Sequence, residues 1–276
     1  MIYPLHMRPR ALLILCLWLI SSFHYAHALQ QTAPASPYAD ALDEARMLFN
    51  KGEYDQAQMA AKLIGSSEGY VLASEALAAK IILAHYDKPN KPSKQAREFA
   101  EKALALNPDN VEAHIQYAVS FGLETQSTGV LKAWRKRMPS RMLKIIETLQ
   151  DIAPNNPRSH ALMGAWHLGI VNRVGKRNAK AWYNANAEDG MAHYHKALAL
   201  SENDIIIISN YATSIIVLGN PDYAKKYIVS LENIKGNNAA EETIRRRVLS
   251  LLALYDQPKA LKRAAKNFLN NRPISA

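Results

Sequence analysis

The sequence predicts an all-α protein in which helical hairpins stack into a solenoid, and three observations lead to this prediction. Small residues recur on one helical face with a period of about 34 residues, as at Ala96, Ala100 and Ala103. A turn residue follows each such stretch, most clearly Pro108 and Pro154. No alternating β-branched run in the sequence is long enough to form a sheet. Repetition of this kind is typical of hairpins that bury their apolar faces only against their neighbours.

The repeats can be followed along the chain as five units. The first has its turn at Gly52-Glu53-Tyr54, and the next four close at Pro108, Pro154, Glu202 and Gly236. Small side chains let two antiparallel helices approach closely, and each proline ends the second helix of its unit. The residues assigned to this packing and to the turns are Ala57, Ala96, Ala103, Pro108, Ala118, Pro154, Gly164, Gly190, Ala197, Gly219 and Ala224. The pattern resembles the tetratricopeptide repeat, which implies a stack of helical hairpins.

Two of the units are longer than the others. The third and fourth exceed the repeat length by roughly 12 and 14 residues. His114 follows Pro108 at the same offset as His160 follows Pro154, so the first helix of each unit keeps its register. The extra residues are therefore expected between the first and second helices of these two units. Insertions gathered on one side of a solenoid often belong to its binding side.

The last part of the chain is also expected to be helical. Ile205 to Ile208 is the only strand-like stretch, but the repeat phase places it at the start of a first helix, and we expect a helix there. After the fifth unit, Ala260, Ala264 and Leu269 lie on one face of a predicted capping helix. The sequence therefore predicts one helical domain over residues 38–276.

The N-terminal region has the features of an export signal. Arg8 and Arg10 precede the apolar run 11–20, and Ala26-His27-Ala28 is a cleavage motif, so residues 1–28 are expected to be a signal peptide. An uncleaved anchor is the alternative. Cleavage near Ala28 would leave a periplasmic or secreted chain with a disordered lead-in over 29–37. The single cysteine, Cys16, lies inside the apolar run, so neither a lipoprotein nor disulfides are expected.

The positive charge of the chain gathers in the two insertions. The formal net charge is +10, and both insertions combine lysine and arginine with aromatic residues. In a stack the two insertions should be neighbours, and together they form a candidate surface for an acidic protein or for anionic lipid. Its residues are Trp134, Arg135, Arg137, Arg141, Arg173, Arg177 and Trp182. The simpler alternative is a solvated basic face, and Arg245 to Arg247 are expected to be ordinary solvated residues. Export argues against nucleic acid as a partner.

Catalytic and cofactor motifs are absent from the sequence. It contains no glycine-rich phosphate loop, no nucleophile elbow and no H-E-x-x-H. His193 and His195 lie on different faces of a helix, while His160 and His167 occupy packing positions of the repeat. We therefore expect no enzyme activity, no cofactor and no metal site.

One segment has a closer family resemblance. A predicted long helix starts with the pattern His160, Gly164 and Trp166. The basic insertion comes next in the chain, and the sequence Lys196-Ala197-Leu198 follows it. The segment 140–205 is similar to two related helical-repeat groups, the regulator of microtubule dynamics group and the periplasmic T-component associated with TRAP transporters. The first resemblance implies a cytosolic or mitochondrial role on microtubules, which the export signal contradicts. The second implies a periplasmic helper that assembles with a solute-binding protein, although this chain lacks a suitable lipidation cysteine. The matching residues are packing positions and imply no binding residue.

These observations favour an exported, non-catalytic protein–protein interaction module of the cell envelope. Its groove, made by the first helices, is expected to hold a peptide or a partner domain. One alternative is a transporter-associated helper that binds a small apolar or anionic ligand in a cavity lined by Met163, Trp166 and Tyr194, or that binds a solute-binding protein. A second alternative is an envelope assembly factor that contacts anionic lipid.

Overall fold

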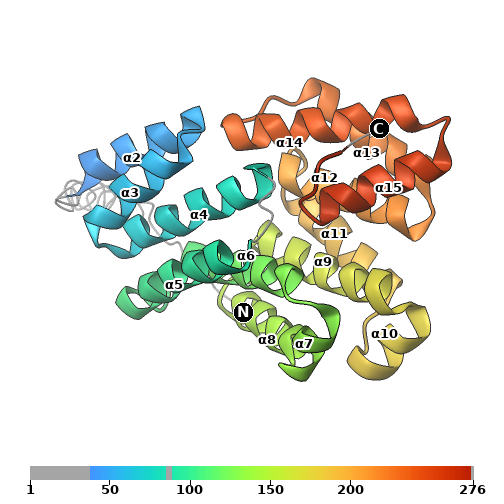
Figure 1. The fold of residues 1–276 in the computed structure, drawn as a ribbon, viewed down its shortest axis with the longest axis horizontal. Coiled ribbons are helices and arrows are strands. Elements are labelled where there is room, and N and C mark those ends of the chain that lie inside the picture. The colour runs from blue at the N-terminus through green and yellow to red at the C-terminus, as the bar shows by residue number, and fades with distance from the viewer. Residues whose placement is uncertain (1–37, 85–88, 275–276) are drawn as a thin grey trace, which may run out of the picture. The chain divides into compact units, whose positions relative to one another are not determined.

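The computed structural model describes residues 38–84 and 89–274, and every regular element in these ranges is a helix (Figure 1). The predicted all-α fold class is therefore confirmed. The compact unit described below is Ala41–Ala276. The expected signal peptide over 1–28 and lead-in over 29–37 lie outside the described residues. In the described part of the chain, no helix is both long enough and apolar enough to cross a bilayer.

Five helical hairpins follow one another, and each consists of a first helix, here called the A helix, and a second helix, the B helix. The pairs are α2 (Ala39–Lys51) with α3 (Tyr54–Ile64), α4 (Ser67–Ala84) with α5 (Asn90–Leu106), α6 (Val111–Ser127) with α8 (Met138–Ile152), α9 (Pro157–Val174) with α11 (Ala187–Leu200), and α12 (Ile205–Leu218) with α13 (Pro221–Ser230). The A helices α4, α6, α9 and α12 also contact one another in succession. Their exposed sides therefore form one continuous inner wall, as expected for a helical solenoid.

The two insertions fold as short helices. Helix α7 (Val130–Arg135) lies between α6 and α8, and helix α10 (Lys176–Tyr183) lies between α9 and α11. Both follow an A helix and precede a B helix, which is where the repeat spacing predicts them. Figure 1 shows both at the same edge of the structure.

The A helices begin at polar caps that recur at one offset from the turn residue. Asn110 accepts a hydrogen bond from the backbone N–H of Ala113 at 3.1 Å, and Asn156 and Asp204 accept equivalent bonds at the starts of α9 and α12. Side-chain oxygens in this position satisfy N–H groups that have no partner within the helix. The cap at Asp204 and the packing of the repeat explain why the isoleucines after it form a helix rather than a strand, as predicted.

Small residues bring the helices of each hairpin close together. The alanines assigned to repeat packing are fully buried: Ala57, Ala96, Ala103, Ala118, Ala197 and Ala224. A Cβ atom at Gly164 would lie 2.5 Å from Cδ2 of Tyr194, and one at Gly190 would lie 2.5 Å from Cδ2 of Leu168. Helices α9 and α11 therefore touch at a separation that only glycine allows. Pro108 and Pro154 lie in exposed turns, and Gly219 ends α12 with a φ of +97°.

The C-terminal region contains more structure than the single capping helix that the sequence predicts. After the 3₁₀ turn Leu231–Asn233 come α14 (Ala239–Leu249), a second 3₁₀ segment (Ser250–Leu254) and α15 (Pro258–Leu269). Both α14 and α15 pack on α12, and α14 also contacts α4. The expectation that Arg245 to Arg247 are all solvated is wrong for Arg245 and Arg247. The guanidinium of Arg245 is mostly buried and donates to the carbonyl oxygen of Leu231 at 3.0 Å. The guanidinium of Arg247 donates hydrogen bonds to the carbonyl oxygens of Ile82 at 3.3 Å and Leu83 at 2.8 Å, at the end of α4.

Candidate functional site

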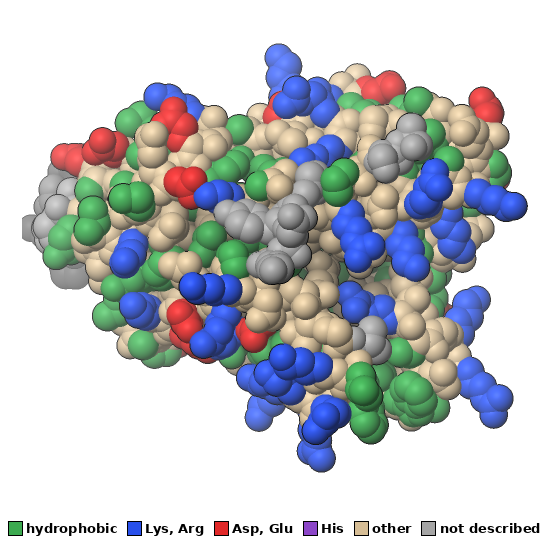
Figure 2. Space-filling model, in the orientation of Figure 1, with side chains coloured by type: hydrophobic (Ala, Val, Ile, Leu, Met, Phe, Trp, Pro, Cys, Tyr) green, Lys and Arg blue, Asp and Glu red, His purple; other side chains and the backbone are tan. Residues whose placement is uncertain are grey.

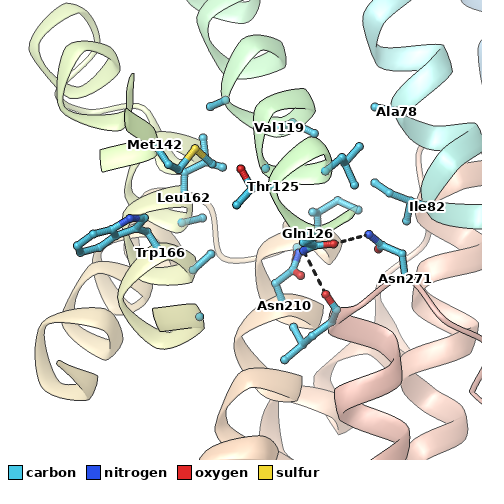
Figure 3. Close-up of a pocket in the computed structure, with 18 of the residues that line it drawn as sticks. Ala78, Ile82, Val119, Thr125, Gln126, Met142, Leu162, Trp166, Asn210 and Asn271 are labelled. Atoms are coloured by element: carbon cyan, nitrogen blue, oxygen red, sulfur yellow. Dashed lines mark hydrogen bonds between the residues drawn. The ribbon is translucent and has the colours of Figure 1, made fainter. Parts of the chain in front are cut away.

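The A helices surround a large cavity. Its volume is about 1290 Å³, and its walls come from α4, α6, α9 and α12 together with parts of α8, α10 and α14. Figure 3 shows side chains around it from α4, α6, α8, α9 and α12, among them Ile82, Val119, Met142, Leu162 and Asn210. Ligand pockets commonly measure about 300–1000 Å³, so the cavity has room for an occupant larger than a typical small molecule.

Most of the cavity wall is apolar. Its small residues create the space, and its larger aliphatic and aromatic residues supply the contact surface. The small residues are Ala78, Ala79, Gly122, Ala161, Ala165 and Gly169, and the larger ones include Ile82, Val119, Leu162, Trp166, Ile170 and Ile206. The indole N–H of Trp166 is used within the protein, because it donates to the carbonyl oxygen of Pro139 at 2.9 Å. The wall therefore favours an occupant with a long apolar surface.

The expected apolar cavity lined by Met163, Trp166 and Tyr194 is only partly matched by the structure. Trp166 and Tyr194 do line the cavity. Met163 is wrong as a lining residue, because its side chain is buried in a core cluster with Ile146 and Ala185 and does not reach the cavity. Trp166, one turn further along α9, belongs to the same cluster and also reaches the cavity.

Arg173 is the charged group of the cavity that is best placed to meet an anionic occupant. Within residues 38–84 and 89–274 no carboxylate forms an ion pair with it, whereas Arg158 pairs with Glu112 at 3.1 Å. The Arg173 side chain is accessible to solvent from the cavity, yet protein atoms surround it. Burial among these atoms lowers the pKa of the Arg173 guanidinium. An accessible guanidinium without a carboxylate partner can pair with an anionic group of a ligand.

Two sets of long-range contacts close the cavity on its C-terminal side. The amide of Gln126, at the end of α6, donates to the carbonyl oxygen of Leu269 at 3.3 Å and accepts from the amide of Asn271 at 2.9 Å (Figure 3). The second set is the pair of bonds from Arg247 to the end of α4. Residues after the repeats therefore meet the second and third units and form part of the cavity wall.

The two insertions meet at the rim of the cavity. Trp134 on α7 and Trp182 on α10 are 58% and 59% exposed, and both also line the cavity. Together with Arg137, Ser140 and Tyr183 they border a smaller notch of about 330 Å³. Two tryptophans from different repeat units therefore lie at one place, which the stacking of the repeats predicts.

The predicted arginines do not share one environment. Arg135 and Arg177 are exposed on the insertions, and Arg137 borders the notch. Arg141 instead lies over the ring of Phe121, with its guanidinium carbon 5.0 Å from the ring centre. Arg173 lies at the cavity. In the space-filling view, lysine and arginine side chains gather around the edge that carries α7, α8 and α10, with hydrophobic side chains between them (Figure 2).

The histidines in the described part of the chain have structural partners. Nε2 of His114 lies 2.8 Å from the carbonyl oxygen of Pro108, and Nε2 of His160 lies 2.8 Å from that of Pro154, so the same histidine contact ties two A helices to their turns. His193 stacks on both His160 and His167. Burial lowers the pKa of His167 and of His193. Over the described ranges, no group of three or more histidine, cysteine, aspartate or glutamate side chains could hold a metal ion.

Some residues of the cavity could not be found from the sequence. Gln126, Asn271 and Arg247 carry no local pattern, because their partners lie between 143 and 165 residues away in the chain. The apolar wall has a weak signal, since alanine and glycine recur on the inner side of α9 at Ala161, Ala165 and Gly169.

Comparison with known proteins places the chain in a family. No curated protein sequence matches it. The family model described as Regulator of microtubule dynamics protein 1-3 matches residues 41–256. This range includes all five hairpins, apart from the first two residues of α2, and it also includes α14 and both 3₁₀ segments. The match extends well beyond the segment 140–205 in which the sequence resemblance is most specific. Because this match covers most of the chain, the protein belongs to the Regulator of microtubule dynamics protein 1-3 family.

Proposed function

We propose that the protein is a non-catalytic interaction module that holds an elongated, largely apolar segment of a partner protein in the cavity between its A helices. One observation carries this proposal: the A helices of four consecutive hairpins contribute to a single cavity of about 1290 Å³. A groove of this kind suits a peptide or an amphipathic helix, which presents a continuous apolar stripe. Membership of a helical-repeat family supports an interaction role.

The rim of the cavity indicates the chemistry of the partner. Trp134 and Trp182 are aromatic groups of the type that dominates interface energies, and basic residues surround them. The bound segment would then carry acidic residues next to its apolar part, because these would meet Arg137 and Arg177 at the insertions and Arg173 at the cavity.

A pair of alanine positions allows a matched test. Ala165 is exposed in the cavity on α9, whereas Ala199 is exposed on α11 and lines neither the cavity nor the notch. A photo-crosslinking amino acid at Ala165 should capture a partner in cells that the same group at Ala199 does not. With the purified partner, Ala165→Trp should weaken binding at least about tenfold, or ~1.4 kcal/mol, while Ala199→Trp leaves it unchanged. Equal effects of the two substitutions would contradict a binding site in the cavity.

A second candidate function is the transporter-associated helper, in which the cavity carries an amphipathic, anionic small ligand. The contacts of Gln126, Asn271 and Arg247 favour it, because they wall off one side of the cavity and shield part of a bound ligand from water. Arg173 would meet the anionic end of the ligand. Native mass spectrometry of the purified protein would then show a bound mass that Ala165→Trp removes and Ala199→Trp retains. A chain that carries no bound mass from cells would leave the peptide proposal in place and contradict this one.

We further propose that the protein works in the cell envelope after export, where the partner could be a solute-binding protein. The support is the basic, apolar and A-x-A pattern of residues 8–28. The family description refers to microtubule dynamics, a role that requires a chain retained inside the cell. Cell fractionation followed by N-terminal sequencing distinguishes the two: export predicts a mature chain that starts just after Ala28, and an intact N-terminus in the cytosol would contradict it.

A further inference from the structure

We propose that the insertions form a docking face for an anionic phospholipid bilayer. The face, called here the insertion face, consists of exposed side chains of α7, of α10 and of the two residues that join α7 to α8. Its members are Leu131, Lys132, Trp134, Arg135, Lys136, Arg137, Lys176, Arg177, Lys180 and Trp182. Leu131, Trp134 and Trp182 also line the cavity, so this inference gives part of the rim a partner other than the acidic segment proposed above, and the test below separates the two.

The apolar part of the insertion face is suited to a membrane interface. Trp134 and Trp182 are more than half exposed, and Leu131 is 69% exposed. Among the tryptophans in the described part of the chain, Trp166 is buried, so both exposed ones belong to the insertions. Tryptophan prefers the headgroup region of a bilayer, because its ring is apolar on one side and carries an N–H on the other.

The charge of the insertion face has one sign. In the sequence, no aspartate or glutamate occurs between Glu124 and Glu147, or between Asp151 and Glu188. In residues 38–84 and 89–274, none of the lysines and arginines of the face forms an ion pair with a carboxylate. The arginines of α14 differ, because Glu242 pairs with Arg245 at 2.9 Å. A surface without internal counter-charges is complementary to a continuous layer of anions.

The shape of the face favours a bilayer over an acidic peptide. A peptide needs a groove that its side chains can fill, and the notch between the tryptophans measures only about 330 Å³. The cations instead lie on two separate short helices, and on the residues directly after the first of them, along one edge of the structure (Figures 1 and 2). A bilayer presents anions to both helices at once and accepts tryptophan and leucine side chains at the same depth.

The test uses the full chain and vesicles of phosphatidylcholine with or without phosphatidylglycerol. The charge variant is Arg135→Glu with Lys136→Glu and Arg177→Glu. The matched control is Lys259→Glu with Lys262→Glu and Arg263→Glu, which makes the same change in net charge on exposed positions of α15. All proteins share the same N-terminal region, so any vesicle binding through that region is common to them.

We expect binding that requires phosphatidylglycerol. Each cation near an anionic surface contributes about fivefold in affinity, so the charge variant should bind at least about 100-fold more weakly. The control should change by no more than about threefold, because solvent screens charges that lie beyond a Debye length from the lipid. Equal weakening of the charge variant and the control would overturn the proposal.

The tryptophans supply a second readout. Brominated lipids should quench the fluorescence of the bound protein, and Trp134→Ala with Trp182→Ala should remove most of this quenching. Undiminished quenching in the double variant would come from Trp18 or Trp166 and would overturn the proposal. Binding to a polyglutamate peptide without binding to vesicles would also overturn it, in favour of an acidic protein as the partner of this face.

Discussion

The contact between α9 and α11 at Gly164 gives a sharp prediction for Gly164→Ala. The added Cβ would lie 2.5 Å from Cδ2 of Tyr194 and 2.9 Å from the carbonyl oxygen of Gly190. Neither neighbour is free to move, since Tyr194 is 1% exposed and stacks on Tyr211 at 4.9 Å, and the other contact is backbone. Carbon atoms pack at about 3.5–4.0 Å, so the two helices would have to separate by about 1 Å.

The size of the effect follows from two opposing contributions. Overpacking of a well-packed interior costs about 1–3 kcal/mol. Replacing glycine by alanine inside a helix stabilises by roughly 0.5–1 kcal/mol, because the unfolded chain loses less freedom on folding. The overpacking cost is the larger of the two, and Gly164→Ala should lower the free energy of unfolding by about 1–2 kcal/mol. The midpoint temperature should fall by a few degrees, at about 2–4 °C per kcal/mol for a domain of this size.

Gly169 provides the matched control on the same helix. It also lies inside α9, but no heavy atom is within 4 Å of the position that its Cβ would occupy. Gly169→Ala should therefore stabilise the protein by roughly 0.5–1 kcal/mol. Thermal and urea unfolding followed by far-UV circular dichroism measure both variants. A Gly164→Ala protein as stable as the unmodified chain would refute the close approach of α9 and α11.

Two further predictions concern the histidine stack and the contact that closes the cavity. Burial lowers the pKa of His167 and His193 below the ordinary 6.5, so between the lowered values and 6.5 the unfolded chain binds protons more readily than the folded one. The free energy of unfolding should therefore fall as the pH drops through about 6.5, by at most ~1.4 kcal/mol per pH unit for each histidine. Urea unfolding midpoints that stay constant from pH 7.5 to 5.5 would contradict this. Arg247→Ala removes the two hydrogen bonds to the end of α4 and should lower the free energy of unfolding by about 1–2 kcal/mol. Arg246 is an exposed neighbour, and Arg246→Ala should change the free energy of unfolding by no more than about 0.5 kcal/mol in the same assay.

The order and type of the helices could be predicted from local sequence, because short-range chemistry decides them. Pro108 and Pro154 end B helices through the missing N–H and the fixed φ of proline. Asn110, Asn156 and Asp204 then cap the next A helix at one constant offset. The positions of α7 and α10 follow from the same offsets, since the A helices keep their register on both sides of each insertion.

The cavity could be predicted only in part. The groove of the A helices follows from the repeat itself, and Trp166 and Tyr194 do line it. Met163 was misplaced, because its side chain is buried in the core cluster with Ile146 and does not reach the cavity, which depends on the packing of α8 against α9. The helical state of the region around Arg245 to Arg247 was expected, but the contacts of α14 with α4 and α12 were not, because its residues have no counterpart in the repeat pattern.

The sequence alone thus determines the stack of hairpins, the site of the insertions and the positive charge that they carry, because each depends on residues a few positions apart. Only the tertiary structure decides that the helices of the stack line a single large cavity. The contacts that close it join Arg247 to Ile82 across 165 residues and Gln126 to Asn271 across 145. Such contacts depend on the rotation between successive hairpins, summed over several repeats, and no local pattern records this sum.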